Sequence, residues 1–153
     1  MEKLIIDSGI KEYQINDNGV LRFNPSDPNV YARFMDAMGK IQSVEDNLVA
    51  KAKELENAES QEANGAAVLR IMAEADRETK KILTEVFGEG NGFDKLLGGV
   101  NLLAVASNGE RVITNFLAAL QPIMVEGAEN CAKQQADKAV AEAKLNRAQR
   151  RAQ

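Results

Sequence analysis

The sequence contains no histidine and no tryptophan, and it has a single cysteine, Cys131, among 153 residues. Without histidine, neither a Ser-His-Asp nor a Cys-His nucleophile can form, and no recognisable zinc site remains. Carboxylates are available, but no pattern marks a catalytic pair of them. One cysteine cannot form an internal disulfide, so a reducing compartment is expected. We therefore expect no enzyme activity, no metal and no cofactor.

Long apolar runs are also missing. No stretch approaches the length needed to cross a bilayer, and residues 1–7 lack the apolar core of a secretory signal. We therefore expect a protein of the cytoplasm with no membrane partner.

Charge is plentiful but unevenly spread. Charged residues make up 27% of the chain and the formal net charge is -4, which argues against nucleic acid binding by the whole surface. Residues 127–153 carry six basic and three acidic side chains, whereas residues 1–126 carry 13 basic and 20 acidic ones. The sequence thus divides into a single acidic domain, residues 1–126, and a basic, alanine-rich tail, residues 127–153.

The first part of the domain is rich in β-forming residues. Residues 4–6, 10–15 and 20–23 form short segments that are separated by turn-forming residues at 7–9 and 16–19. This pattern predicts a small three-stranded antiparallel meander over residues 3–23. Such a sheet is marginal alone and should pack on a helix, and an open edge could pair with a neighbouring copy.

Helical periodicity follows the strands. Asp27 is placed to cap a helix and Pro28 to occupy its first position, so we predict a helix over about residues 28–57. Its apolar positions recur at intervals of three or four: Val30, Phe34, Met38, Ile41, Val44, Leu48, Ala52 and Leu55. Gly39 inside it costs roughly 1 kcal/mol relative to alanine, which suggests a close helix crossing or a slight bend.

A second helix is predicted over about residues 66–87, after an interruption that includes Ser60, Asn64 and Gly65. Its apolar stripe consists of Val68, Ile71, Met72, Ala75, Thr79, Ile82, Leu83 and Val86, whereas Arg70, Arg77, Glu78, Lys81 and Glu85 should be exposed. Two successive amphipathic helices with a short connection favour an antiparallel hairpin.

Three alternating glycines, Gly88, Gly90 and Gly92, then interrupt the helical pattern at residues 86–93. A phosphate-binding loop needs a preceding strand and a defined Gly-Lys-Ser/Thr or G-x-G-x-x-G spacing, neither of which is present. We interpret Gly88 as the residue that ends the second helix, and the other glycines as positions that permit positive φ.

The remaining third of the chain is less regular at first. Residues 93–106 are apolar but broken by Gly98 and Gly99. Ser107 and Glu110 have capping-box spacing, which predicts a helix over about residues 109–126 that Pro122 should kink near Ala118 or Ala119. Beyond residue 127 the pattern predicts a helical tail that is solvated or held by a partner. The fold class is therefore mainly α (α+β), with a helical hairpin or bundle after the small sheet.

Three stretches together resemble a known family. They are residues 23–34 (FNPSDPNVYARF), 86–90 (VFGEG) and 116–122 (FLAALQP). With the charged helix pair between them, they look like the small tail assembly chaperones of long-tailed, siphovirus-like bacteriophages and prophages of Gram-positive bacteria. The resemblance covers most of residues 4–126.

The resemblance implies a non-enzymatic chaperone that coats the phage tape-measure protein until tail-tube subunits replace it. Such a chaperone acts in the bacterial host cytoplasm and is absent from the mature virion. Such proteins are often made in two lengths by programmed frameshifting, and self-association into oligomers is expected. The hypothetical partner-binding residues are Phe34, Met38, Ile41, Phe87, Gly88, Gly90, Phe93, Phe116, Arg147, Arg150 and Arg151. Three alternatives stay open: a connector or scaffold component of the phage, a small nucleic-acid-binding regulator that uses the tail and, least favoured, an enzyme.

Overall fold

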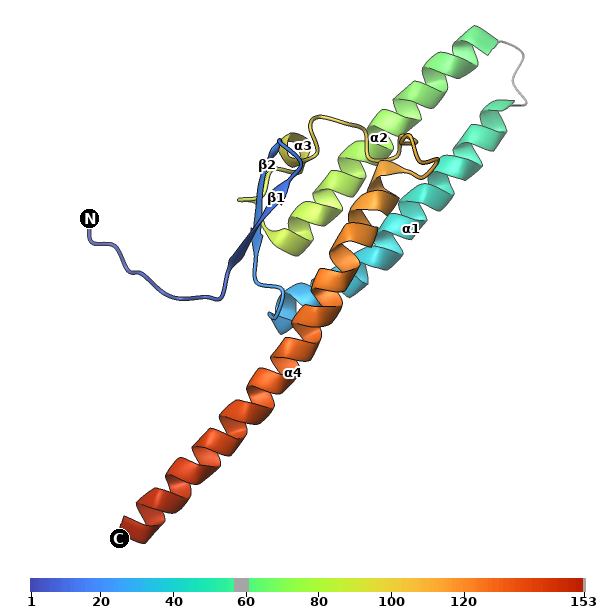
Figure 1. Cartoon of the computed structure of the whole chain (residues 1–153). Helices are drawn as coiled ribbons and strands as arrows, with labels where there is room; N and C mark the ends of the chain where they lie inside the picture. Colours follow the sequence, from blue (N-terminus) through green and yellow to red (C-terminus); the bar gives the residue numbers. More distant parts are fainter. Residues whose placement is uncertain (57–60, 153) are drawn as a thin grey trace.

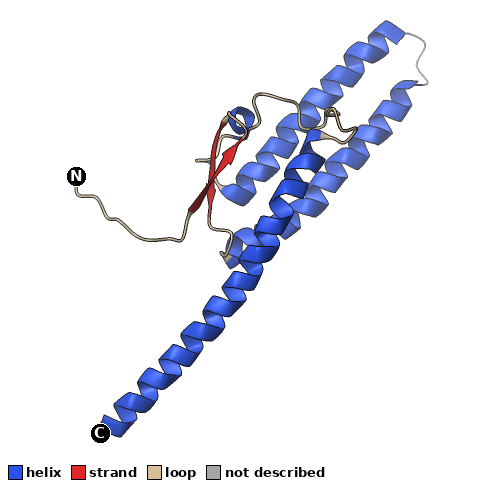
Figure 2. Ribbon diagram, in the orientation of Figure 1, coloured by secondary structure: helices blue, strands red, loops and turns tan. Residues whose placement is uncertain are grey.

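The computed structural model describes residues 1–56 and 61–152, with the backbone alone at 61–64. Two strands, β1 (Lys11–Ile15) and β2 (Gly19–Phe23), precede the long helices α1 (Pro28–Glu56) and α2 (Gln61–Phe87). A short helix, α3 (Phe93–Leu96), and a long one, α4 (Val112–Ala152), follow. The hairpin of β1 and β2 lies against the end of α2 (Figure 1). Helix α4 crosses α1 and continues far beyond the other elements (Figure 1). Helix dominates the described chain (Figure 2), so the predicted mainly α fold class is confirmed.

The sheet is a two-stranded antiparallel hairpin rather than the predicted meander. β1 and β2 pair from Lys11 with Phe23 to Ile15 with Gly19. Residues 4–6 form no strand, so the prediction of a third strand was wrong. The reason lies at the expected turn, where the Asn24 amide donates a hydrogen bond to the Ser8 carbonyl at 3.1 Å. This contact holds residues 8–9 beside Asn24 instead of letting them return along β1.

The helices α1 and α2 form the predicted antiparallel pair. The Asp27 carboxylate accepts a hydrogen bond from the Asn29 N–H at 2.9 Å, which confirms the predicted cap. Five predicted stripe positions of α1 are buried, and Ala37 is buried in place of Met38: Val30, Phe34, Ala37, Ile41, Val44 and Leu48. The last two predicted positions, Ala52 and Leu55, are only half-buried. Gly39 makes no close helix crossing, because a Cβ there would meet no atom within 4 Å.

The second helix begins earlier than predicted. α2 starts at Gln61, so Asn64 and Gly65 lie inside it and do not interrupt it, whereas Ser60 lies outside the described residues. The five charged residues expected on its surface are all exposed: Arg70, Arg77, Glu78, Lys81 and Glu85.

The glycine joint ends α2 as predicted. Gly88 has φ +98° and its N–H donates to the Thr84 carbonyl at 2.8 Å. Gly90 and Gly92 do not adopt positive φ, so that part of the prediction was wrong. The buried polar residue of the joint is Asn91, whose amide accepts from the Arg22 N–H at 2.8 Å and donates to the Arg22 and Phe87 carbonyls at 2.9 Å. One asparagine thereby fastens the joint to β2.

An aromatic chain runs through the core and connects five elements. Neighbouring ring centroids lie 4.9 to 6.1 Å apart, at tilted or edge-on angles that suit aromatic pairs. Its members, in order, are Tyr13, Phe23, Phe87, Phe93 and Phe116.

The last helix starts later and runs longer than predicted. The Ala106 N–H donates to the Glu110 carbonyl and the Val112 N–H to the Ala104 carbonyl, so residues 104–112 pair with each other. The Glu110 N–H, which a capping box would direct to Ser107, donates instead to the Asn108 side chain at 3.1 Å, and α4 begins only at Val112. It then continues as one helix through Pro122 and into the predicted tail; the kink at Pro122 stays a prediction.

Gly127 marks where α4 leaves the body. A Cβ at this position would lie 1.9 Å from the Pro25 carbonyl oxygen, so only glycine permits so close an approach. From residue 132 to 152 every residue is exposed, and this part of α4 extends away from the other elements (Figure 1).

Candidate functional site

A groove of about 660 Å³ lies between α1 and α4. Buried side chains form its floor, among them Phe34, Ile41 and Met124. Large apolar side chains stay exposed at its rim: Tyr31 at 38%, Met35 at 54%, Met38 at 38% and Val125 at 50%. The other lining residues are Gln42, Glu45, Thr114, Leu117, Ala118 and Gln121. The groove is thus apolar along its length and carries one charged side chain.

Helical spacing explains how the groove forms. Tyr31, Met35, Met38 and Gln42 follow one another at intervals of four, three and four, so they share a face of α1 beside its buried stripe. On α4, Thr114, Leu117, Gln121 and Val125 follow at intervals of three, four and four, so they too share one face. At 1.5 Å of rise per residue, the lining of α1 from residue 31 to 45 extends over roughly 21 Å. A groove of that length matches about four turns of a helix.

The chemistry of the lining suits an apolar partner that varies in detail. Methionine is unbranched and adapts its shape to different neighbours, which is why it is common at permissive binding surfaces. Contiguous exposed apolar groups on a protein surface mark interaction sites. A partner helix with apolar residues at every third or fourth position could place them between α1 and α4.

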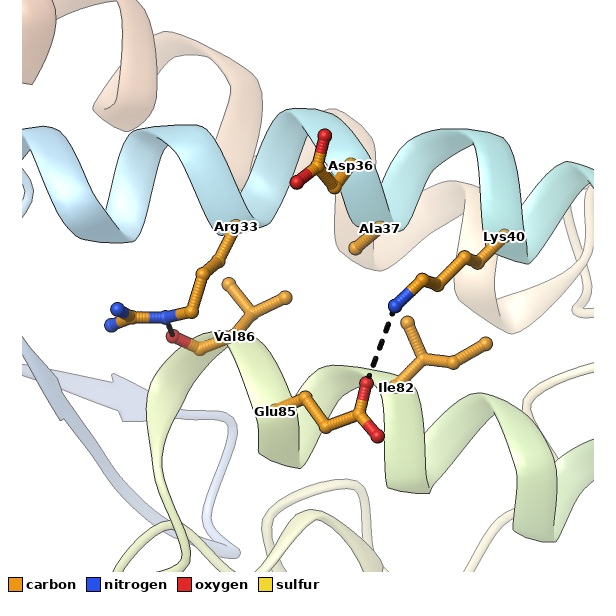
Figure 3. A pocket seen from close by; sticks show the side chains of 7 residues that line it. All are labelled: Arg33, Asp36, Ala37, Lys40, Ile82, Glu85 and Val86. Atoms are coloured by element: carbon orange, nitrogen blue, oxygen red, sulfur yellow. Dashed lines mark hydrogen bonds and ion pairs between the residues drawn. The ribbon is translucent and has the colours of Figure 1, made fainter.

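A second, smaller hollow of about 140 Å³ separates α1 from α2 (Figure 3). The Arg33 Nε donates to the Val86 carbonyl at 3.0 Å, which satisfies an acceptor in the last turn of α2. The Lys40 ammonium lies 3.6 Å from the Glu85 carboxylate, whereas Asp36 points away from both (Figure 3). The contacts of Arg33 and Lys40 both cross from α1 to α2, so they hold the two helices together.

A cluster of charged side chains connects α3 to α2. The Lys80 ammonium lies 2.8 Å from Asp76 and 2.6 Å from Asp94, and Asp76 also accepts from the Leu102 N–H at 2.7 Å. Burial alone would lower the pKa of Lys80, but hydrogen bonds and the negative charges of Asp76 and Asp94 outweigh it and raise this pKa. Each member has a partner within the protein, and the cluster holds the loop after α3 in place.

The sequence-predicted partner-binding residues lie in three separate places. Phe34, Met38 and Ile41 line the α1–α4 groove. Phe87, Phe93 and Phe116 belong to the buried aromatic chain, and Gly88 and Gly90 are exposed at the joint. Arg147, Arg150 and Arg151 are exposed near the end of α4. The structure therefore brings the first three together at the groove and the three phenylalanines together in the core.

Several groove residues escaped the sequence-based prediction, notably Tyr31, Met35, Leu117 and Val125. Their signal was present as a second apolar stripe at helical spacing next to the buried one. That signal is readable only once the position of α4 is known.

In the part of the chain that the structure describes, no three acidic or cysteine side chains gather as a metal site would require. Of the helices in this part, none combines the length and the hydropathy of a membrane span. Comparison with protein-family models, curated proteins and solved structures finds no match.

Proposed function

We propose that this protein is a tail assembly chaperone of a long-tailed bacteriophage or prophage, which coats the tape-measure protein and helps to recruit tail-tube subunits. The observation that carries the proposal is the α1–α4 groove, with Tyr31, Met35, Met38 and Val125 exposed along it. The family resemblance suggests which client the groove binds. Residues 23–34, which carry part of that resemblance, run into α1, the helix that forms one wall of the groove.

The client explains why such a groove stays open. A tape-measure protein is a long helical chain with apolar stripes, which would aggregate if left uncovered. A groove about four turns long covers only a short piece of such a stripe. Stable interfaces bury about 1,600 Å² in total, and a contact of four turns buries less than that. Each copy would therefore bind weakly and could be displaced when tail-tube subunits arrive.

The end of α4 has a proposed role beside the groove. From Lys144 to Arg151 it carries four basic side chains and no acidic one, whereas residues 1–126 are acidic. The exposed basic end can therefore lie against the body of a neighbouring copy, or against acidic parts of the client.

Co-expression with the candidate tape-measure protein tests the proposal. We expect the client to stay soluble with the natural chain and to aggregate with a Met35→Glu and Met38→Glu double variant. Both side chains are exposed, so the variant should remain folded. Leu69→Glu is the matched control, because Leu69 is 70% exposed on α2 outside the groove. A client that aggregates beside the natural chain would contradict the proposal.

Two further measurements separate the alternatives. A connector or scaffold component would persist in assembled particles, so abundant peptides of this protein in purified virions would replace the chaperone proposal. A nucleic-acid-binding regulator is favoured by one observation, the run of basic residues at the end of α4. It predicts salt-dependent retention on DNA that is lost when Arg147, Arg150 and Arg151 are replaced with alanine.

A further inference from the structure

Residues 1–10 lie outside the folded body. Each of them is exposed, and the segment leaves the hairpin in an extended path (Figures 1 and 2). Three consecutive apolar side chains are exposed to solvent, with exposed fractions of 86% for Leu4, 88% for Ile5 and 77% for Ile6. Isoleucine is a strong β-former and exposed apolar strands pair readily with other strands. We call residues 4–6 the apolar arm.

The direction of the arm is built into the fold. The Asn24 side chain donates to the Ser8 carbonyl at 3.1 Å and accepts from the Ser26 N–H at 2.9 Å, so its own position is fixed. Gly9 has φ +73°, and a Cβ there would lie 2.7 Å from the Asn24 amide nitrogen. These contacts lead the arm away from the β1 strand of its own chain.

The two edges of the hairpin differ. At the β2 edge, the N–H and the carbonyl of Arg22 both bond to the Asn91 side chain, which acts there as a short substitute for a strand. Because these groups point away from β1, Glu12 and Arg22 form a non-hydrogen-bonded pair. Backbone alternation then directs the N–H and carbonyl groups of Glu12 and Gln14 outward. No described residue bonds to them, so the edge of β1 is open.

We propose that the apolar arm of one copy pairs, as an added strand, with the open β1 edge of a second copy. In a strand Leu4 and Ile6 share one face, and pairing can place them beside Tyr13 and Ile15, the half-buried side of β1. Because every copy carries both the arm and the edge, two copies can satisfy each other reciprocally. The three-stranded sheet that the sequence predicts is then completed between chains.

The β1 edge suits the arm better than the α1–α4 groove does. An extended segment carries backbone donors and acceptors that need partners when they lose water. The edge offers such groups in strand spacing, whereas the groove offers apolar side chains and the side-chain polar groups of Gln42, Glu45, Thr114 and Gln121. The groove is thereby left free for another occupant. This inference is independent of the proposed function, since it needs no client.

Analytical ultracentrifugation of the full chain tests the pairing. We expect the natural protein to self-associate, and a Leu4→Lys and Ile6→Lys double variant to associate at least about tenfold more weakly. Gln14→Pro should weaken association similarly, because proline removes an outward N–H from an edge strand. Leu69→Lys is the control for added charge, and circular dichroism checks that each variant is folded. A monomeric natural protein, or unchanged association of the arm variant, would overturn the proposal.

Cysteine cross-linking locates the contact. In a Cys131→Ser background, Ile5→Cys protein mixed with Gln14→Cys protein should form a disulfide-linked pair under mild oxidation. The same Ile5→Cys protein mixed with Met38→Cys protein should not. Cross-linking to position 38 in place of position 14 would put the arm in the groove and contradict the strand pairing.

Discussion

Helix α1 has two apolar sides, and they differ in what covers them. One side packs against α2 and the core through Val30, Ala37, Val44 and Leu48, each no more than 5% exposed. The other side faces α4 across the groove and leaves Tyr31, Met35 and Met38 at 38 to 54% exposed.

The residue types on the two sides differ as well. The sealed side uses valine and leucine beside alanine, which have few side-chain conformations, whereas the open side uses two methionines and a tyrosine. Stiff residues suit a fixed neighbour and flexible ones suit a variable neighbour. The comparison indicates that the open side is an exposed binding surface rather than an incomplete core.

The largest expected effect lies on the sealed side. Leu48→Ala should lower the free energy of unfolding by about 2–5 kcal/mol, because it removes the apolar contacts of a buried side chain. Met35→Ala on the open side should change it by about 0.5 kcal/mol or less. Urea denaturation monitored by circular dichroism measures both. Equal losses for the two variants would mean that the two sides of α1 do not differ.

The next largest effect is expected at the contact between α4 and Pro25, which fixes α4 beside the groove. Gly127→Ala should destabilise the fold by about 1–3 kcal/mol, because the new methyl group collides with the Pro25 carbonyl and α4 must shift. The same variant should weaken client binding, since the far wall of the groove moves with α4. Thermal unfolding and client co-purification report the two effects; an unchanged melting temperature would place α4 further from Pro25.

A glycine on α1 should respond in the opposite direction. Gly39 has no neighbour within 4 Å, so Gly39→Ala should stabilise the protein by up to about 1 kcal/mol through helix propensity alone. The melting temperature should rise, with client binding unchanged. A fall would reveal a partner on that face of α1.

The smallest effect concerns pH. The folded-state pKa of Lys80 lies above its ordinary value of 10.5, so its ion pairs stabilise the fold below that pH. This stabilisation is lost as the pH rises through the raised pKa. Lys80→Met should therefore lose less stability than the natural protein as the pH rises above 10.5. Lys81→Met, at an exposed neighbouring position, should keep the natural pH dependence in urea titrations.

Local signals were enough to predict the three long helices, but not where α2 and α4 begin. Most of the apolar stripes of α1 and α2, the Asp27 cap and the Gly88 terminus depend on residues close in sequence, and the structure has them. The failures come from contacts between distant residues. Asn24 draws residues 8–9 away from the sheet, and pairing of residues 104–112 delays the start of α4.

The groove could be predicted only in part for the same reason. Phe34, Met38 and Ile41 are predicted as partner-binding residues from one helical stripe. In the structure Phe34 and Ile41 form the floor of the groove, and Met38 alone of the three lies at its rim. Met35 and Tyr31 become groove residues only because α4, about 80 residues away in sequence, packs beside α1. Buried aromatic residues such as Phe87 look the same in sequence as exposed ones.

The position of Tyr31 has an optical consequence. The chain has no tryptophan, so Tyr31→Trp would introduce one fluorophore at the rim of the groove with no background from other indoles. Its emission maximum would report directly whether that rim is in contact with water or with a bound chain. Occupancy of the groove could then be followed in real time during assembly, without labelling the client.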